Sequence, residues 1–202
     1  MHYTEKCGDN MNIILASASP RRKEIMNLYG LDYKVIPSNA DEDIDIECPY
    51  EMVKALASKK AQSIAVDNKD DLVIGADTIV YLDGKILGKP SSEEDAFKIL
   101  KSLSGKSHEV VTGVSLICKN KNISISDYEV TKVYFKCLTD EEIQFYIDSK
   151  EPLDKAGSYG IQGIGSVFVE KIEGCYFNVV GLPVNKLYNL LGRIGVNLLE
   201  RK

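Results

Sequence analysis

Apolar side chains recur along this chain at both strand and helix spacings, which predicts a fold that contains both. Residues 12–17 and 33–38 are short apolar segments that indicate strands, whereas residues 50–66 carry apolar side chains at helical spacing. Residues 72–82 form a nearly continuous apolar run, which is typical of a central strand covered on both faces. The remaining long apolar segments alternate with polar residues, and we expect them to pair as antiparallel strands: 108–119 and 123–138.

Short polar signals mark the turns and the starts of the other helices. Asp83-Gly84 predicts a tight hairpin after the central strand. Two hydroxyl residues stand three positions before a glutamate, the capping-box pattern of a helix start: Ser91 with Glu94, and Thr139 with Glu142. We expect a short strand pair after the glycine-rich residues 155–168, and a last helix from Pro183. Helices interleaved with parallel-type and antiparallel strands predict an α/β protein with a mixed sheet.

Composition narrows the class of protein without naming an activity. The 202 residues suit one domain, in one or two lobes, and the 44% hydrophobic content is ordinary for a soluble globular protein. A net charge of −5 argues against broad nucleic-acid binding, although a local basic pocket remains compatible with it. No apolar run reaches membrane-spanning length.

The cysteines and the first residues indicate a cytoplasmic protein. Five scattered cysteines lack a C-x-x-C pair, and two histidines are too few to complete a zinc site with them, so reduced thiols are expected. Residues 1–11 lack the apolar stretch of a signal peptide and are predicted to be a disordered extension. Residues 12–202 then form the folded domain, with no internal repeat or linker.

The first unusual feature is a helix start that carries cations. Ser19 and Pro20 fit the N-cap and first positions of a helix, with Ile25, Leu28 and Tyr29 on its apolar face. Its first turn is nevertheless basic, "RRK" at residues 21–23, beside the positive end of the helix dipole. A solvated basic patch would explain this, but a strand–turn–helix junction is also where α/β proteins bind phosphates. We favour an anion site.

Two charged residues fall at positions where burial is expected. Counting in heptads from Val53 places Lys60 on the apolar stripe of its helix, where the amine either escapes to water or needs a negative partner. Asp77 interrupts the central strand, and an unpaired carboxylate there would be costly. Gly75, on the same strand face, allows another backbone or a ligand to approach. A buried salt bridge could explain Asp77, but a metal-binding or general-base role is favoured.

Other polar stretches are weaker signals. Residues 41–47 form an acidic loop, solvated by default, of which one member could reach a divalent ion; spacing does not select which. Lys89 in "LGKP" has no distinguishing feature of its own. The glycines of residues 157–165 match neither the P-loop nor the dinucleotide pattern, so they form either a flexible turn or a backbone-lined wall. In the second case, Gln162 offers an amide to a nucleotide base.

Taken together, these segments resemble the Maf family of nucleotide pyrophosphatases. The resemblance rests on "LASASPRR", "GADTIV", "LGKP", "HEVVTGVSL" and "EPLDKAGSYGIQGIG", in this order, and runs from Asn12 almost to the C-terminus. It implies a two-lobed α/β fold with a central cleft, as in Maf and ITPase-like proteins. It also implies hydrolysis of a nucleoside triphosphate to the monophosphate and pyrophosphate, with Mg²⁺ or Mn²⁺, and a homodimer.

The same resemblance implies roles for particular residues. Asp77 is the catalytic acid–base residue, and together with Glu42 it is the expected metal ligand. Substrate-binding residues are expected along the whole motif series: Ser17, Ser19, Arg21, Arg22, Glu42, Lys60, Thr78, Lys89 and Gln162. Within the family, the combination of Arg21, Thr78 and Gln162 is similar to the subgroup that acts on dTTP and UTP. Two alternatives stay open: a regulatory protein that binds a nucleotide without turnover, and an enzyme for altered purine triphosphates such as ITP or methylated GTP.

Overall fold

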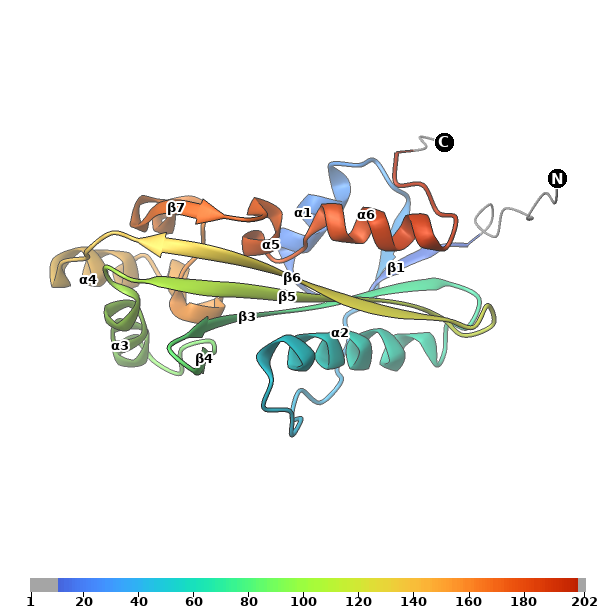
Figure 1. The fold of residues 1–202 in the computed structure, drawn as a ribbon, viewed down its shortest axis with the longest axis horizontal. Coiled ribbons are helices and arrows are strands. Elements are labelled where there is room, and N and C mark those ends of the chain that lie inside the picture. The colour runs from blue at the N-terminus through green and yellow to red at the C-terminus, as the bar shows by residue number, and fades with distance from the viewer. Residues whose placement is uncertain (1–10, 200–202) are drawn as a thin grey trace. The chain divides into compact units, whose positions relative to one another are not determined.

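The computed structural model describes residues 11–199 of the chain and groups them into two compact units (Figure 1). Unit 1 comprises the described residues of Met1–Asp77, Gly113–Tyr128 and Gly181–Lys202, and unit 2 comprises Thr78–Thr112 and Glu129–Val180. The predicted extension at residues 1–11 lies outside the described residues except for Met11. No helix in the described part combines the length and the apolar character needed to cross a bilayer.

The strands form one hydrogen-bonded order, β2-β1-β3-β5-β6-β7, with β4 paired to β3. Their bounds are β1 Ile13–Leu15, β2 Tyr33–Val35, β3 Leu72–Leu82, β4 Lys85–Leu87, β5 Ser107–Cys118, β6 Ile123–Phe135 and β7 Val169–Glu173. β1 is parallel to both β2 and β3, whereas β4 is antiparallel to β3 and β7 to β6. The prediction of an α/β protein with a mixed sheet is therefore confirmed, and β3 has the bounds that its apolar run indicated.

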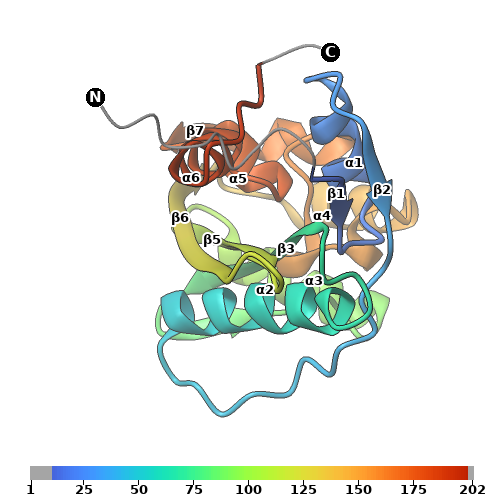
Figure 2. The ribbon, with the colours of Figure 1, turned by 90° about the vertical axis from the view of Figure 1, so that its right-hand side faces the viewer.

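Unit 1 places helices on both sides of its strands. Its helices are α1 Pro20–Asn27, α2 Pro49–Ala65 and α6 Val184–Arg193, and α2 and α6 lie on opposite faces of the strands (Figures 1 and 2). The core beneath α2 joins small side chains to branched ones: Ile14, Ala16, Ala61, Ala65, Val73 and Ile117. Small residues on α2 let its backbone approach the strands closely.

The closest approach is at Gly75 of β3. A Cβ atom added to Gly75 would lie 2.2 Å from the carbonyl oxygen of Ala57 and 2.9 Å from the Cβ of Ala61. Any side chain at this position would therefore displace α2 from β3. Gly75 sets the spacing of the two elements that carry Lys60 and Asp77.

Unit 2 has a separate, aromatic core. Phe135, Tyr159 and Phe168 meet there with edge or tilted ring contacts, and His108 Nε2 lies 2.8 Å from the Tyr159 hydroxyl. Burial lowers the pKa of His108 to about 4, so the ring is neutral at pH 7. The helices of this unit are α3 Glu93–Leu103, α4 Asp140–Asp148 and the short α5 Tyr176–Val180.

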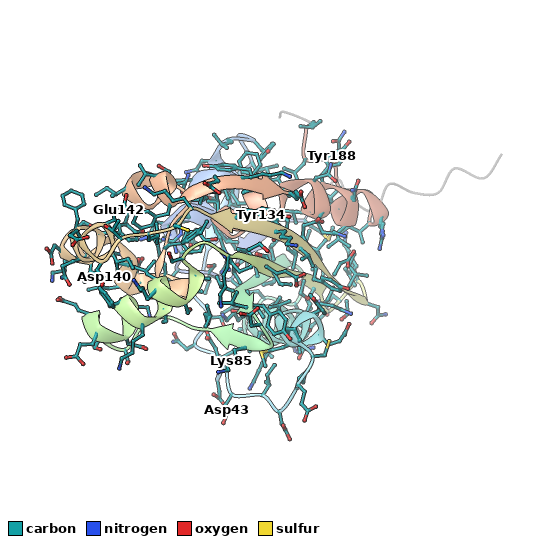
Figure 3. The ribbon with its side chains drawn as sticks, turned by 60° about the vertical axis from the view of Figure 1, so that its left-hand side comes forward. Asp43, Lys85, Tyr134, Asp140, Glu142 and Tyr188 are labelled. Atoms are coloured by element: carbon teal, nitrogen blue, oxygen red, sulfur yellow. The ribbon has the colours of Figure 1, made fainter. Side chains whose placement is uncertain are left out.

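The helix-start predictions in unit 2 are right in one case and shifted in the other. Thr139 and Glu142 form the predicted capping box of α4, whose first turn carries Asp140 and Glu142 (Figure 3). The box predicted for Ser91 and Glu94 is wrong by one residue. Ser92 is the N-cap and accepts a hydrogen bond from the Asp95 amide, because the chain turns one residue later than the pattern suggests.

The glycine-rich segment differs from its prediction. Three short 3₁₀ helices occupy it, Glu151–Asp154, Ala156–Ser158 and Gly163–Phe168. The expected strand pair is a single strand, β7, because the residues after Gly174 turn into α5 instead. The last helix starts at Val184, with Pro183 as its N-cap residue.

Replacing Gly75 with alanine is predicted to destabilise the protein by about 1–3 kcal/mol, the usual cost of overpacking a core. Gly192 of α6 is the control, because an added Cβ there meets nothing within 4 Å. Gly192→Ala should leave stability unchanged or slightly raised, since alanine favours helices over glycine. Urea denaturation measures both variants, and wild-type stability for Gly75→Ala would contradict the close-packing argument.

Candidate active site

The junction of β1 and α1 forms a polar turn in unit 1. Ser19 caps α1 by accepting the Arg22 amide at 3.5 Å, and Pro20 takes the first helical position, as predicted. The first turn of α1 contains no acidic residue, so no carboxylate of its own helix faces the positive end of the helix dipole. The apolar face differs from the prediction: Ile25 and Met26 are buried, whereas Leu28 is 67% exposed because the helix ends before it.

The Ser17 hydroxyl is arranged as a hydrogen-bond donor. Its oxygen accepts the Ser19 amide at 3.2 Å and Arg22 Nη1 at 3.1 Å, and the residue is buried. A hydroxyl has two acceptor lone pairs and one proton. Because both lone pairs of the Ser17 hydroxyl already accept hydrogen bonds, it can only donate its proton to a ligand. A phosphate oxygen is an acceptor and fits this donor.

The Arg22 guanidinium is fixed in the same turn. Its Nε donates to the Gly181 carbonyl at 2.8 Å, in addition to the bond from Nη1 to Ser17. Burial lowers the pKa of Arg22 from its ordinary value, and the charge of Asp77 opposes that shift. Arginine stays protonated in proteins, so a fixed positive charge stands beside Ser17 and Asp77. Arg21 is half-buried on the same turn.

Lys60 joins two carboxylates in unit 1. Its Nζ lies 2.5 Å from Oδ1 of Asp77 and 2.8 Å from Oε1 of Glu42. The side chains of Lys60 and Asp77 are 14% and 11% exposed, whereas that of Glu42 is 65% exposed. Lys60 thus lies on the buried stripe of α2 as the heptad count predicted, and its amine has the negative partner that burial requires.

The acidic loop at residues 36–48 reaches Lys60 because α2 holds it at several points. The loop runs along α2 before entering the helix (Figure 2), with Asp43 on its outer part (Figure 3). Ser38 and Ser63 share a hydrogen bond of 2.9 Å, and Lys59 Nζ donates to the Asp43 carbonyl at 3.3 Å. These attachments hold the loop so that Glu42, among its acidic residues, pairs with Lys60.

The carboxylates that Lys60 bridges suit a divalent cation. Among the described residues, no group of three or more histidine, cysteine, aspartate or glutamate side chains could hold a metal ion alone. Mg²⁺, however, is commonly bound by one or two carboxylates that share it with substrate phosphates. Asp77 and Glu42 both lie within 2.8 Å of one Nζ atom, so their oxygen donors converge on one place and fit that mode.

Unit 2 holds the other three predicted site residues. Thr78 is half-buried on β3, and its hydroxyl lies 2.9 Å from that of Thr112. Lys89 and Gln162 are exposed, Lys89 after β4 and Gln162 before the third 3₁₀ helix. The two loops that carry them are linked, because the Gly157 amide donates to the Gly88 carbonyl at 3.0 Å.

A glycine is required where the loop that leads to Gln162 packs on β3. Gly157 has φ +69°, a backbone conformation that L side chains rarely adopt, and a Cβ there would lie 2.7 Å from Val80 Cγ2. Gly157 is therefore packed against β3 and is not part of a loosely held turn. That arrangement places the Gln162 side chain on a fixed loop.

A cavity of about 800 Å³ lies elsewhere in unit 1. Lys59, Ser63 and Val66 of α2 line it together with Asp41, Cys118 and residues of the turn between β5 and β6. None of the predicted site residues is among its lining. Lys59 thus lines this cavity, whereas its neighbour Lys60 contacts Asp77 and Glu42.

Comparison with known proteins identifies the family. The profile of a family described as "Maf-like protein" matches residues 12–194. This chain belongs to the Maf family. Proteins named dTTP/UTP pyrophosphatase match it closely in sequence. That of Syntrophomonas wolfei is 49% identical over 189 residues, which cover 93% of this chain and all of the relative.

Two other relatives carry the same name. The Bacillus cereus protein (strain ATCC 10987) is 50% identical over 198 residues, 97% of each chain. The protein of Carboxydothermus hydrogenoformans is 51% identical over 185 residues, 92% of this Maf chain and all of the relative. Among solved structures, the Ham1 protein of Staphylococcus aureus matches with a TM-score of 0.46 and 17% identity, covering 61% of this chain and 71% of the other.

Sequence reasoning missed three residues of this Maf protein that lie next to the predicted site residues. The Gly181 carbonyl holds Arg22, and Thr112 and Asn178 lie behind Thr78. The only local signal is polarity at buried positions, since Thr112 and Asn178 are both fully buried. Each contact joins residues that are far apart in the sequence, so spacing alone does not reveal it.

Replacing Lys60 with methionine is predicted to lower the free energy of unfolding by about 2–4 kcal/mol, because the buried Asp77 carboxylate loses its ion-pair partner. Lys59→Met is the matched control. Its amine is more exposed, at 39%, and its pair with Asp41 spans 3.7 Å, so the expected loss is below about 1 kcal/mol. Urea denaturation at pH 7 compares the two variants, and equal losses would show that Lys60 does not stabilise Asp77.

Proposed function

We propose that this Maf protein hydrolyses dTTP and UTP to the nucleoside monophosphate and pyrophosphate. The main structural support for this proposal is the environment of Asp77 in unit 1. Its buried carboxylate pairs with Lys60, and the charge of Arg22 and the hydroxyl of Ser17 accompany it. Near-full-length relatives at about half identity are named for this reaction, which supports the substrate assignment.

The phosphates are bound by the cationic turn of unit 1. Ser17 donates its proton to a phosphate oxygen, and Arg22 contributes a fixed charge that costs no rearrangement when substrate binds. Arg21 and the N-terminus of α1, capped by Ser19, add charge and backbone donors. Lys60 and Lys89 offset the remaining negative charge of the triphosphate.

Asp77 acts at the reacting phosphorus. Lys60 engages its Oδ1 atom, and Oδ2 accepts the proton of the water that attacks the α-phosphorus. The α-phosphorus–oxygen bond to the β-phosphate breaks, and pyrophosphate leaves. A divalent cation, Mg²⁺ or Mn²⁺, held by Asp77 and Glu42 with phosphate oxygens, would supply charge neutralisation at the phosphates.

The cellular setting belongs to the same proposal. We place the protein in the cytoplasm, as a homodimer that removes nucleotides and does not bind nucleic acid. The cytoplasmic location is supported by the absence of a disulfide among the four cysteines that the structure describes. The net charge of −5 supports small-molecule substrates over nucleic acid.

Wild-type protein with Mg²⁺ is predicted to release pyrophosphate from dTTP and UTP faster than from ITP or methylated GTP. Asp77→Asn should lower this rate roughly a thousandfold, because losing a group that contributes about 4 kcal/mol to the barrier has that effect. Asp83→Asn is the control: Asp83 lies just after β3, but its side chain is 69% exposed and pairs with Lys106. Pyrophosphate release and circular dichroism are measured on all three proteins.

Each result of this comparison has a distinct meaning. Near wild-type turnover by Asp77→Asn would remove Asp77 from the mechanism. Nucleotide binding without pyrophosphate release by the wild type would indicate a regulatory protein. Preference for the purine triphosphates would overturn the assignment of dTTP and UTP.

Gln162→Ala is predicted to reduce discrimination between bases more than the chemical step. The exposed Gln162 amide can donate to and accept from a base edge, and it is distant in the sequence from the phosphate-binding turn. The ratio of kcat/KM for UTP to that for CTP should fall severalfold, with kcat for UTP less affected. Gln144→Ala on the surface of α4 is the control, and an equal loss on every triphosphate from Gln162→Ala would contradict a base-reading role.

A further inference from the structure

A buried tyrosine holds one side of the loop that carries Gln162 in unit 2. The Gly160 amide, two residues before Gln162, donates to the Tyr146 hydroxyl oxygen at 3.1 Å. The Tyr146 hydroxyl uses its own proton in a bond of 2.9 Å to Oε1 of Glu151. Tyr146 is fully buried, and its ring meets that of Phe168 edge-on at 5.1 Å between centroids. This anchor of the loop therefore belongs to the core of unit 2.

The Glu151 carboxylate holds the other side of the same loop. Its Oε2 atom accepts the Ile164 amide at 3.0 Å, and its Oε1 atom accepts the Gly165 amide at 3.3 Å. With the Tyr146 hydroxyl, three donors thus converge on one carboxylate. An ionised carboxylate suits all three, because it only accepts and has two oxygens.

The two ends of residues 160–165 meet at Tyr146. A Cβ atom added to Gly165 would lie 2.6 Å from the Gly160 carbonyl oxygen and 2.7 Å from the Tyr146 hydroxyl oxygen. Gln162 is exposed within this closed segment. The contacts on either side of Gln162 therefore fix the position of its backbone.

We infer that Glu151 and Tyr146 are positioning residues that hold Gln162 for recognition of the base. This inference rests on the proposed function and adds to it the groups on which base selectivity depends. A glutamine amide can either donate or accept. A moving loop would let Gln162 turn its oxygen or its NH₂ group to any base, whereas a fixed loop limits that choice and pays less entropy when substrate binds.

The first test replaces one acceptor of the carboxylate. Glu151→Gln keeps the shape of the side chain but exchanges one oxygen for an NH₂ group. Either orientation of the new amide sets this NH₂ group against a backbone amide, that of Ile164 or that of Gly165, so one side of the loop is released. The ratio of kcat/KM for UTP to that for CTP should fall about as far as in Gln162→Ala, mainly through KM.

A double variant separates positioning from a general structural role. If Glu151 acts through Gln162, adding Glu151→Gln to Gln162→Ala should leave the ratio within about twofold of that of Gln162→Ala alone, because the two changes remove one shared interaction. Tyr146→Phe removes the hydroxyl but keeps the ring, and it should lower the ratio as Glu151→Gln does. It decides the same question if Glu151→Gln does not fold.

Glu142→Ala is the matched control for lost stability. Glu142 caps α4, the helix that carries Tyr146, and it pairs with Lys136. Its removal weakens unit 2 and leaves in place the hydrogen bonds of Glu151 and Tyr146 to the loop. The UTP/CTP ratio of Glu142→Ala should equal that of the wild type, and a fall as large as that of Glu151→Gln would overturn the inference.

The outcomes also distinguish this inference from the proposed function. A wild-type ratio in Glu151→Gln and Tyr146→Phe, beside a lowered ratio in Gln162→Ala, overturns the inference alone, and so does a further fall in the double variant. An unchanged ratio in Gln162→Ala overturns both the inference and the base-reading role. Absence of turnover on UTP and dTTP overturns the proposed function instead, and the ratios of affinity for UTP and CTP, measured by calorimetry on the same variants, then decide the inference.

Discussion

The chemistry proposed for this protein depends on the contact between the Lys60 ammonium and the Asp77 carboxylate. Two buried charges at 2.5 Å require elements that are held at a fixed spacing, and the side-chain-free Gly75 beneath Ala57 and Ala61 provides it. A buried pair of this kind contributes little net stability, because desolvation offsets the attraction. The reaction proposed at Asp77 accounts for such a pair better than stability does.

The direction of its hydrogen bonds determines what Ser17 offers to a ligand. At Ser17 the lone pairs are filled by amide and guanidinium donors, so the hydroxyl faces a ligand as a donor. This polarity suits a phosphate oxygen, which accepts hydrogen bonds.

Sequence patterns predicted the parts of this protein that depend on local periodicity. The apolar run of β3 located Asp77, heptad spacing placed Lys60 on the buried stripe, and Thr139 marked the start of α4. Sequence patterns did not show which residue of the acidic loop pairs with Lys60, because the path of that loop depends on contacts with α2. Nor did they reveal the hydrogen bonds that join Thr78, Thr112 and Asn178, which only folding brings together.

The most direct test of the account is a crystal structure of the protein with a UTP analogue that carries a non-hydrolysable α,β-imido bridge. We expect phosphate oxygens within hydrogen-bond distance of Ser17 and Arg22, with the α-phosphorus beside Asp77. A triphosphate bound in the cavity of unit 1 that Lys59 lines, away from Asp77, would contradict this expectation.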